Sequence, residues 1–195
     1  VDVAAEHSPD EQTLADLRSF AESVVSPARV TIVGPERIPR DQWPRTWTRE
    51  SIQNLAAANI RVTDEPRQAS VYVLYAERQD DQTAAGAKTV DWIIPTSTGT
   101  RVVRGMWLVG YSLQHALTTF TSRAALEKFV LKHEFGHVLG LVKNSSHESR
   151  SAPSHCIRRG CLMETFLDFG LARYLALGLP GNRLPKALCP QCLAD

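Results

Sequence analysis

The spacing of hydrophobic and polar residues predicts a chain that mixes helices with strands. Four segments repeat apolar residues every three or four positions, which places those side chains on one helical face. The predicted helices span residues 9–25, 48–59, 122–140 and 166–179. Five runs rich in β-branched and aromatic residues predict strands. These strands are expected at residues 29–34, 60–63, 70–76, 90–96 and 101–113. The last run is the longest, and we expect it to form an exposed sheet edge.

Capping residues mark the ends of three predicted helices. Ser8 precedes Pro9 and is expected to cap the first helix. Thr48 and Ser122 are the expected caps of the next two. Gly140 is expected to end the third, because glycine readily adopts the left-handed conformation found after helices.

The order of these elements predicts one α+β domain that spans residues 1–195. A mixed twisted sheet and the longest apolar helix fall within 1–140, which we expect to form an upper lobe. Residues 141–195 contain a serine-rich segment, all four cysteines and the last predicted helix. We expect them to form a small lower lobe with a surface loop at 141–154.

Composition and charge narrow the class of protein. Apolar residues make up 43% of the chain and charged residues 22%, which is typical of globular proteins. The net charge of +1 argues against nucleic-acid or membrane-surface binding driven by bulk electrostatics. No apolar run is long enough to predict a membrane span. The chain begins with Val1 and not Met, so we expect a trimmed chain, and we expect it to be a monomer.

The segment HEFGH in the third predicted helix carries metal-binding chemistry. His133 and His137 are four residues apart, so their rings project from one helical face and can bind a single Zn²⁺. Glu134 follows the first histidine, where its carboxylate can act as general base on a metal-activated water. A catalytic zinc usually has three protein ligands, so a third is expected downstream.

Several residues compete for the role of third ligand. Lys143 stands where the compact form of the motif has a histidine, but its ammonium group has no lone pair. His155 and His147 are the main candidates. Weaker candidates are the carboxylates Glu148, Glu164 and Asp168.

The sequence HCIRRGCLM (155–163) and the terminal CPQC (189–192) complete a longer pattern. Together with HEFGHVLG they resemble the archaemetzincin family of the metzincin clan, over residues 126–192. The resemblance implies a metzincin-like fold, with His155 as the third ligand of a catalytic zinc and Met163 in a Met-turn. It also implies a second, structural zinc held by four cysteines, Cys156, Cys161, Cys189 and Cys192. One departure is the segment between Gly140 and His155, which has 14 residues where the family has two.

The inserted residues are expected to be tolerated. Lengthening a loop by this amount costs on the order of 2 kcal/mol, because closure entropy grows slowly with length. Zinc binding contributes on the order of 10 kcal/mol or more. The polar, serine-rich insertion is expected to extend into solvent.

The cysteines have a second interpretation. In a secreted protein the two close pairs could form two disulfides, whereas zinc binding favours a cytoplasmic location. The sequence does not decide between the two compartments.

The expected function is zinc-dependent hydrolysis of a peptide or protein substrate. An extended substrate is expected to pair with the edge strand near residues 107–111. The alternative is a catalytically degenerate or latent zinc-binding protein with a regulatory role, in which Lys143, His147 or Glu148 covers the metal.

Overall fold

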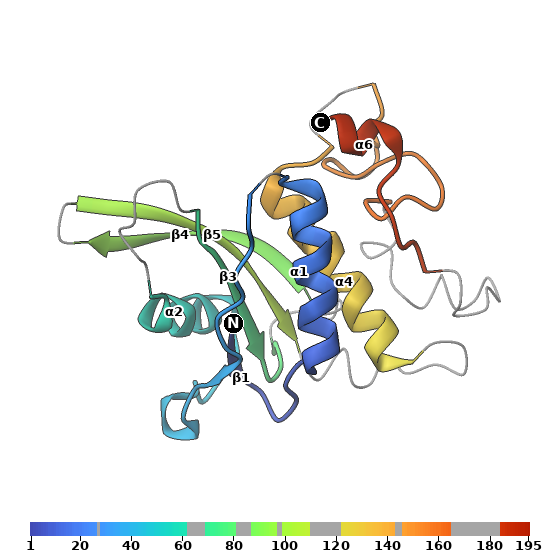
Figure 1. Ribbon diagram of the computed structural model, residues 1–195. Helices are drawn as coiled ribbons and strands as arrows, with labels where there is room; N and C mark the ends of the chain where they lie inside the picture. Colours follow the sequence, from blue (N-terminus) through green and yellow to red (C-terminus); the bar gives the residue numbers. More distant parts are fainter. Residues whose placement is uncertain are drawn as a thin grey trace.

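The computed structural model confirms an α+β fold built on a mixed five-stranded sheet (Figure 1). It describes residues 1–26, 28–61, 69–80, 87–96, 99–109, 122–142, 146–164 and 184–195. The strands are β1 (Asp2–Ala4), β2 (Glu36–Arg37), β3 (Val71–Ala76), β4 (Ala87–Thr96) and β5 (Gly99–Val109). The helices are α1 (Glu11–Val24), the 3-10 turn η1 (Arg40–Gln42), α2 (Arg49–Asn59), α4 (Arg123–Leu139) and α6 (Pro190–Ala194).

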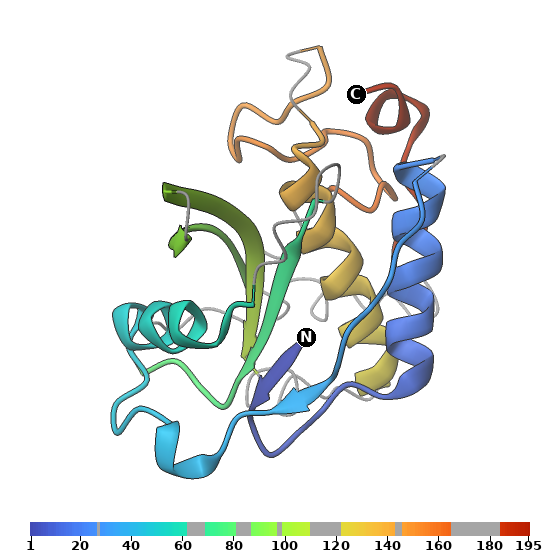
Figure 2. The ribbon, with the colours of Figure 1, turned by 60° about the vertical axis from the view of Figure 1, so that its left-hand side comes forward.

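The sheet has the order β2-β1-β3-β5-β4. The first four of these strands run parallel to one another, and β4 is antiparallel to β5. Helices α1 and α4 cover one face and α2 covers the other (Figure 2). Successive β3 side chains point to opposite faces of the sheet. Tyr75 packs toward α4, and Leu74 packs toward α2.

Two of the three predicted helix caps are confirmed. The Thr48 side chain accepts a hydrogen bond from Ser51 N, and Ser122 accepts one from Ala125 N. The first helix begins later than predicted, since Asp10 and not Ser8 is its cap and accepts from Thr13 N at 2.6 Å. An aspartate at this position satisfies the helical N–H groups as well as a serine does.

The strand predicted at 29–34 is wrong. This segment has no regular structure, and only Glu36–Arg37 pairs with β1. Val30 and Ile32 pack partly buried against the core, whereas Val33 is 67% exposed. The alternating apolar residues of this segment therefore reflect packing of one side against the core. The segment does not form the hydrogen-bonded ladder that defines a strand.

The strand predicted at 101–113 is confirmed as β5 within the described residues, but its predicted position at an edge is wrong. It lies between β3 and β4, and β4 is the edge strand. The run Gly105–Val109 is buried throughout, as expected of a strand covered on both faces.

The three remaining strand predictions have mixed outcomes. The strands at 70–76 and 90–96 are confirmed, within β3 and the longer β4. The strand at 60–63 is wrong where it can be compared, because Ile60 is the C-cap of α2. Residues 62–63, 110–113 and the predicted helix at 166–179 lie outside the described residues.

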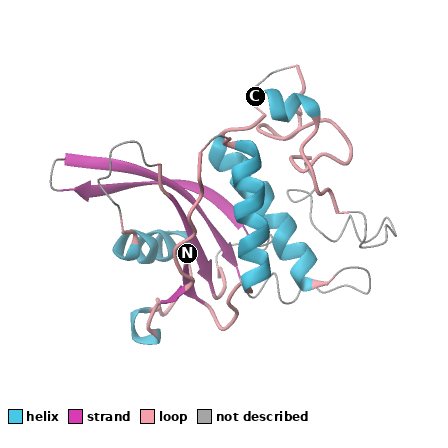
Figure 3. Ribbon diagram, in the orientation of Figure 1, coloured by secondary structure: helices cyan, strands magenta, loops and turns pink. Residues whose placement is uncertain are grey.

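Residues that follow α4 are mostly loop in the described part of the chain, apart from α6 (Figure 3). Helix α4 ends as predicted at Gly140, which has φ 76° and ψ 29°. The chain then turns away from the sheet, and the cysteine-bearing segments gather at this end of α4. None of the helices in the described ranges has the length and apolar character needed to cross a bilayer.

Close packing joins α4 to the segment that contains Met163. The Met163 side chain is fully buried, and a Cβ added at Gly136 would overlap its Sδ and lie 3.1 Å from its Cε. Because Gly136 has no side chain, Met163 can pack directly against α4. Gly136 is the residue before His137.

We expect Gly136→Ala to destabilise the protein by about 1–3 kcal/mol through overpacking. In a Met163→Ala background the same change is expected to stabilise by up to about 1 kcal/mol, because alanine is the better helix former. Denaturant unfolding of the four variants in this cycle measures the coupling. Equal effects of Gly136→Ala in both backgrounds would contradict the contact.

Candidate metal centres

Three histidines converge at the end of α4. His133 and His137 project from the same helical face, and His155 reaches them from the loop that follows the helix. One ring nitrogen of each lies within 4.8 Å of the others. The ring centroids are 4.7 Å apart for His133 and His137, 5.2 Å for His133 and His155, and 4.7 Å for His137 and His155.

Main-chain carbonyls set the tautomers of two of these rings. His133 Nδ1 lies 2.7 Å from the Leu162 carbonyl oxygen, and His155 Nδ1 lies 3.0 Å from that of Pro153. A carbonyl only accepts, so both Nδ1 atoms carry the proton and both Nε2 atoms have a lone pair. Metal-binding histidines are commonly held by such carbonyl contacts.

The nitrogen geometry suits a small divalent ion. The Nε2 atoms of His133 and His137 are 3.1 Å apart. Two imidazole ligands of a tetrahedral zinc at 2.0–2.1 Å would be roughly 3.3–3.4 Å apart. Burial, with the neighbouring rings of His133 and His155, lowers the pKa of His137 to about 3. The ring is therefore neutral at physiological pH and can donate its lone pair.

The described part of the insertion, residues 146–154, folds back as a short hairpin that brings His155 to the histidine group. Ser149 N donates to the His155 carbonyl at 2.7 Å, and Ile157 N donates to the His147 carbonyl at 3.0 Å. Ser149 and Ala152 are buried. The prediction of a segment extending into solvent is wrong for these two residues, whereas it is confirmed for Ser146, Arg150, Ser151, Pro153 and Ser154, which are exposed.

His147 does not join the three-histidine group. Its Nε2 lies 3.6 Å from Cys192 Sγ and 3.2 Å from Asp195 Oδ2. Two other candidates hold turns: Glu148 Oε1 accepts from Ser154 N, and Glu164 Oε2 accepts from Gly160 N. Lys143 and Asp168 lie outside the described residues. Of the placed candidates, only His155 lies with His133 and His137.

Glu134 lies beside the histidine group on α4 and is 7% exposed. Thr89 on the edge strand β4 donates its hydroxyl to Glu134 Oε2 at 3.0 Å. This contact links the candidate general base to β4, the outer strand of the described sheet. Thr89 was missed in the sequence because the predicted strand began one residue after it.

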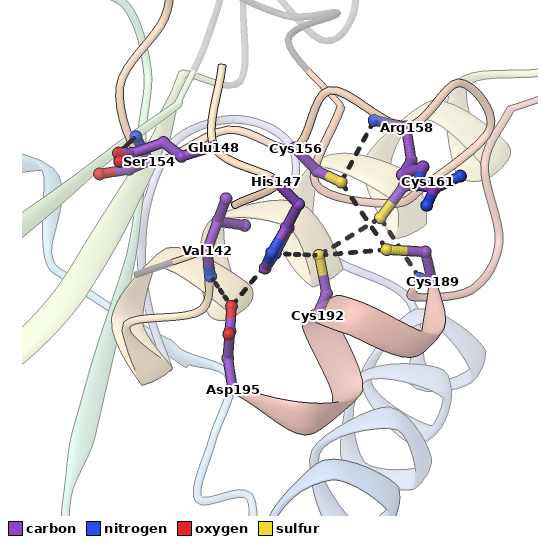
Figure 4. A network of polar contacts seen from close by, with 10 residues as sticks. All are labelled: Val142, His147, Glu148, Ser154, Cys156, Arg158, Cys161, Cys189, Cys192 and Asp195. Atoms are coloured by element: carbon purple, nitrogen blue, oxygen red, sulfur yellow. Dashed lines mark hydrogen bonds and ion pairs between the residues drawn. The ribbon is translucent and has the colours of Figure 1, made fainter. Parts of the chain in front are cut away.

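The four cysteines form a second group. Their sulfurs lie within 4.8 Å of one another and face a common centre (Figure 4). The distances are 3.7 Å for Cys156–Cys189, 3.6 Å for Cys161–Cys192 and 3.6 Å for Cys189–Cys192. Four thiolates around a tetrahedral zinc at 2.3 Å would be roughly 3.8 Å apart. All four cysteines are free thiols, so the predicted alternative of two disulfides is not observed.

The pKa values of the thiols differ within this group. Burial raises the pKa of Cys156 to about 11 and raises that of Cys192 further, whereas hydrogen bonds outweigh burial and lower the pKa of Cys189. Binding of a divalent ion would displace these protons, since thiolates are the metal-binding form. The structure thus has one three-histidine and one four-cysteine group, each positioned to hold a metal ion.

Comparisons with known proteins identify no relative. No protein-family model, no curated protein sequence and no solved structure matches this chain. The resemblance to archaemetzincins therefore depends on the sequence pattern itself.

We expect two metal ions per chain in protein purified with excess zinc. His155→Ala is expected to leave one ion, because it removes a ligand of the histidine group. His147→Ala is expected to retain two under the same conditions. Elemental analysis of the desalted proteins measures the ratio. Loss of an ion from His147→Ala, with two ions retained by His155→Ala, would mean that His147 and not His155 is the third ligand.

Proposed function

We propose that this chain is a zinc-dependent peptidase with a metzincin-like fold. The observation that carries the proposal is the convergence of three imidazoles beside a carboxylate on the same helix. Three histidine ligands leave a coordination position open, as in catalytic zinc sites, whereas four cysteines fill all positions, as in structural sites. This difference supports a catalytic role for the histidine group and a structural role for the cysteine group.

A zinc ion at the histidine group would act as a Lewis acid toward a water molecule and the scissile carbonyl. Glu134 accepts the proton of the attacking water and passes it to the departing amine. Thr89 restrains the rotamer of that carboxylate through its contact with Oε2. His133 and His155 would hold the ion through Nε2, because carbonyls accept hydrogen bonds from their Nδ1 atoms.

The peptide substrate lies along β4 in this proposal, and not along residues 107–111. Strand β4 has β5 on one side and is the sheet edge, and its Thr89 contacts Glu134. An extended peptide can add to such an edge through main-chain hydrogen bonds. That pairing would bring a substrate carbonyl toward the carboxylate of Glu134.

Two further features support the archaemetzincin-like assignment. Met163 is buried against α4 at Gly136, where a Met-turn residue would support the histidine group. His155 and Cys156 are neighbours in sequence and belong to different metal groups, as the family pattern implies.

One observation favours the alternative of a zinc-binding protein without catalysis. His133 is 1% exposed, His155 6% and Glu134 7%. A peptide must reach these groups for hydrolysis, so deep burial suits a latent or degenerate site. Activity measurements separate the two functions.

Glu134→Gln is expected to abolish peptide cleavage, with a loss of about 10²–10⁴-fold or more, because the amide cannot accept the proton. Metal content is expected to be unchanged, since Glu134 is not a ligand. Cleavage of a diverse peptide library, followed by mass spectrometry, measures activity.

The matched control is Glu11→Gln, an exposed carboxylate in the first turn of α1. It is expected to cleave at the wild-type rate. Wild-type protein that holds two zinc ions and cleaves no peptide in the library would reject the peptidase function in favour of the alternative.

Thr89→Val is expected to lower kcat by about tenfold, with a smaller effect on KM, because a hydrogen bond to a charged group contributes about 1.5 kcal/mol or more. Thr89→Ser retains the hydroxyl and is expected to stay close to wild type. Steady-state kinetics across pH measure both variants. A loss in the serine variant, with wild-type kcat in the valine variant, would show that the methyl group, and not the hydroxyl, matters.

A further inference from the structure

The Cys192 sulfur differs from the other three in the kind of group that faces it. Backbone N–H groups donate to two of the other sulfurs: Arg158 N to Cys156 and Cys189 N to Cys161. Nε2 of His147 lies 3.6 Å from the Cys192 sulfur. Figure 4 shows the imidazole between this sulfur and the Asp195 carboxylate.

The surroundings of His147 determine which ring nitrogen carries the proton. Nε2 faces two acceptors, Asp195 Oδ2 at 3.2 Å and Cys192 Sγ at 3.6 Å. Nδ1 is buried and has no hydrogen-bond partner within the described ranges. A proton on Nε2 therefore makes contacts that a proton on Nδ1 would lack.

Asp195 holds this ring in place from a second direction. Its Oδ2 also accepts a hydrogen bond from Val142 N at 2.8 Å. Val142 has φ 65°, a conformation that a β-branched residue adopts only under constraint. Asp195 thus connects the end of α4, the inserted hairpin and the cysteine group through one carboxylate.

Charge explains why a donor at Cys192 matters. Four thiolates around one divalent ion carry a formal charge of about −2, and buried charge is costly unless it is hydrogen-bonded. His147 is 2% exposed and Cys192 fully buried, so water does not serve this sulfur. A donor also draws electron density from the thiolate, which weakens its attack on electrophiles and its competition for a proton.

We propose that His147 shares its Nε2 proton between the Asp195 carboxylate and the Cys192 sulfur, so that the inserted hairpin retains the metal of the four-cysteine group. His147 is a positioning residue here and not a metal ligand. The proposal is independent of peptide hydrolysis, because it concerns the cysteine group alone. In this proposal, the insertion between Gly140 and His155 helps to retain the metal of the four-cysteine group.

The test uses full-length protein loaded with Co²⁺. Only the cysteine group produces a thiolate-to-cobalt charge-transfer band, so the band reports this site in the presence of the histidine group. His147→Leu removes the donor at similar size, and His147→Gln supplies an amide N–H in its place. Arg150→Gln changes an exposed residue of the same hairpin and is the control.

In His147→Leu we expect cobalt to be lost to excess chelator about tenfold faster than in wild type. The charge-transfer band is expected to move to longer wavelength, because a thiolate without its hydrogen bond is easier to oxidise. His147→Gln and Arg150→Gln are expected to stay close to wild type. Asp195→Asn is expected to give an intermediate rate, since the amide orients the ring less strongly.

Two results would overturn the proposal. The first is a His147→Leu protein with the wild-type release rate and band position. The second is faster release in both His147→Gln and His147→Leu with unchanged bands, which would mean that the imidazole acts by packing and not by donating a proton. Alkylation of Cys192 by N-ethylmaleimide, followed by peptide mass spectrometry, gives an independent rate. If His147→Leu does not fold, the Asp195→Asn rate decides.

Discussion

The adjacency of His155 and Cys156 is the constraint on which both candidate metal centres depend. Neighbouring side chains in an extended segment point in opposite directions, so one peptide unit can serve two ions. Cys156 N donates to the Met163 carbonyl, and His133 Nδ1 donates to the next carbonyl back, that of Leu162. The segment 155–163 is therefore tied to itself and to α4 at the level of the histidines. A shift of either metal group would displace the other.

Burial bears on how each group would bind a cation. The described core brings the neutral imidazole of His137 close to the rings of His133 and His155, and it gathers four thiols of which Cys156 has a raised pKa. A divalent ion in each group converts crowded lone pairs into ligands. The two donor sets differ in kind, so the proposed division into a catalytic and a structural zinc follows from coordination chemistry.

The insertion illustrates how a sequence departure can be compensated. Fourteen residues between Gly140 and His155 would place the third histidine at random if they were a free loop. The hairpin pairs Ser149 with His155 and Ile157 with His147 instead, so the added length closes on itself. The contacts of His147 with Cys192 and Asp195 then join that hairpin to the C-terminal cysteines.

Local chemistry in the sequence was sufficient for the helix from Ser122 to Gly140, the pairing of His133 with His137, and the two groups of metal-binding residue types. These features depend on spacing along one helix and on capping, which act over a few residues. Only the tertiary structure decided that β5 is an internal strand, that His155 and not His147 lies with the helix histidines, and that Thr89 contacts Glu134. Each of these depends on contacts between segments distant in sequence, where burial and hydrogen-bond geometry choose among partners that the sequence leaves equivalent.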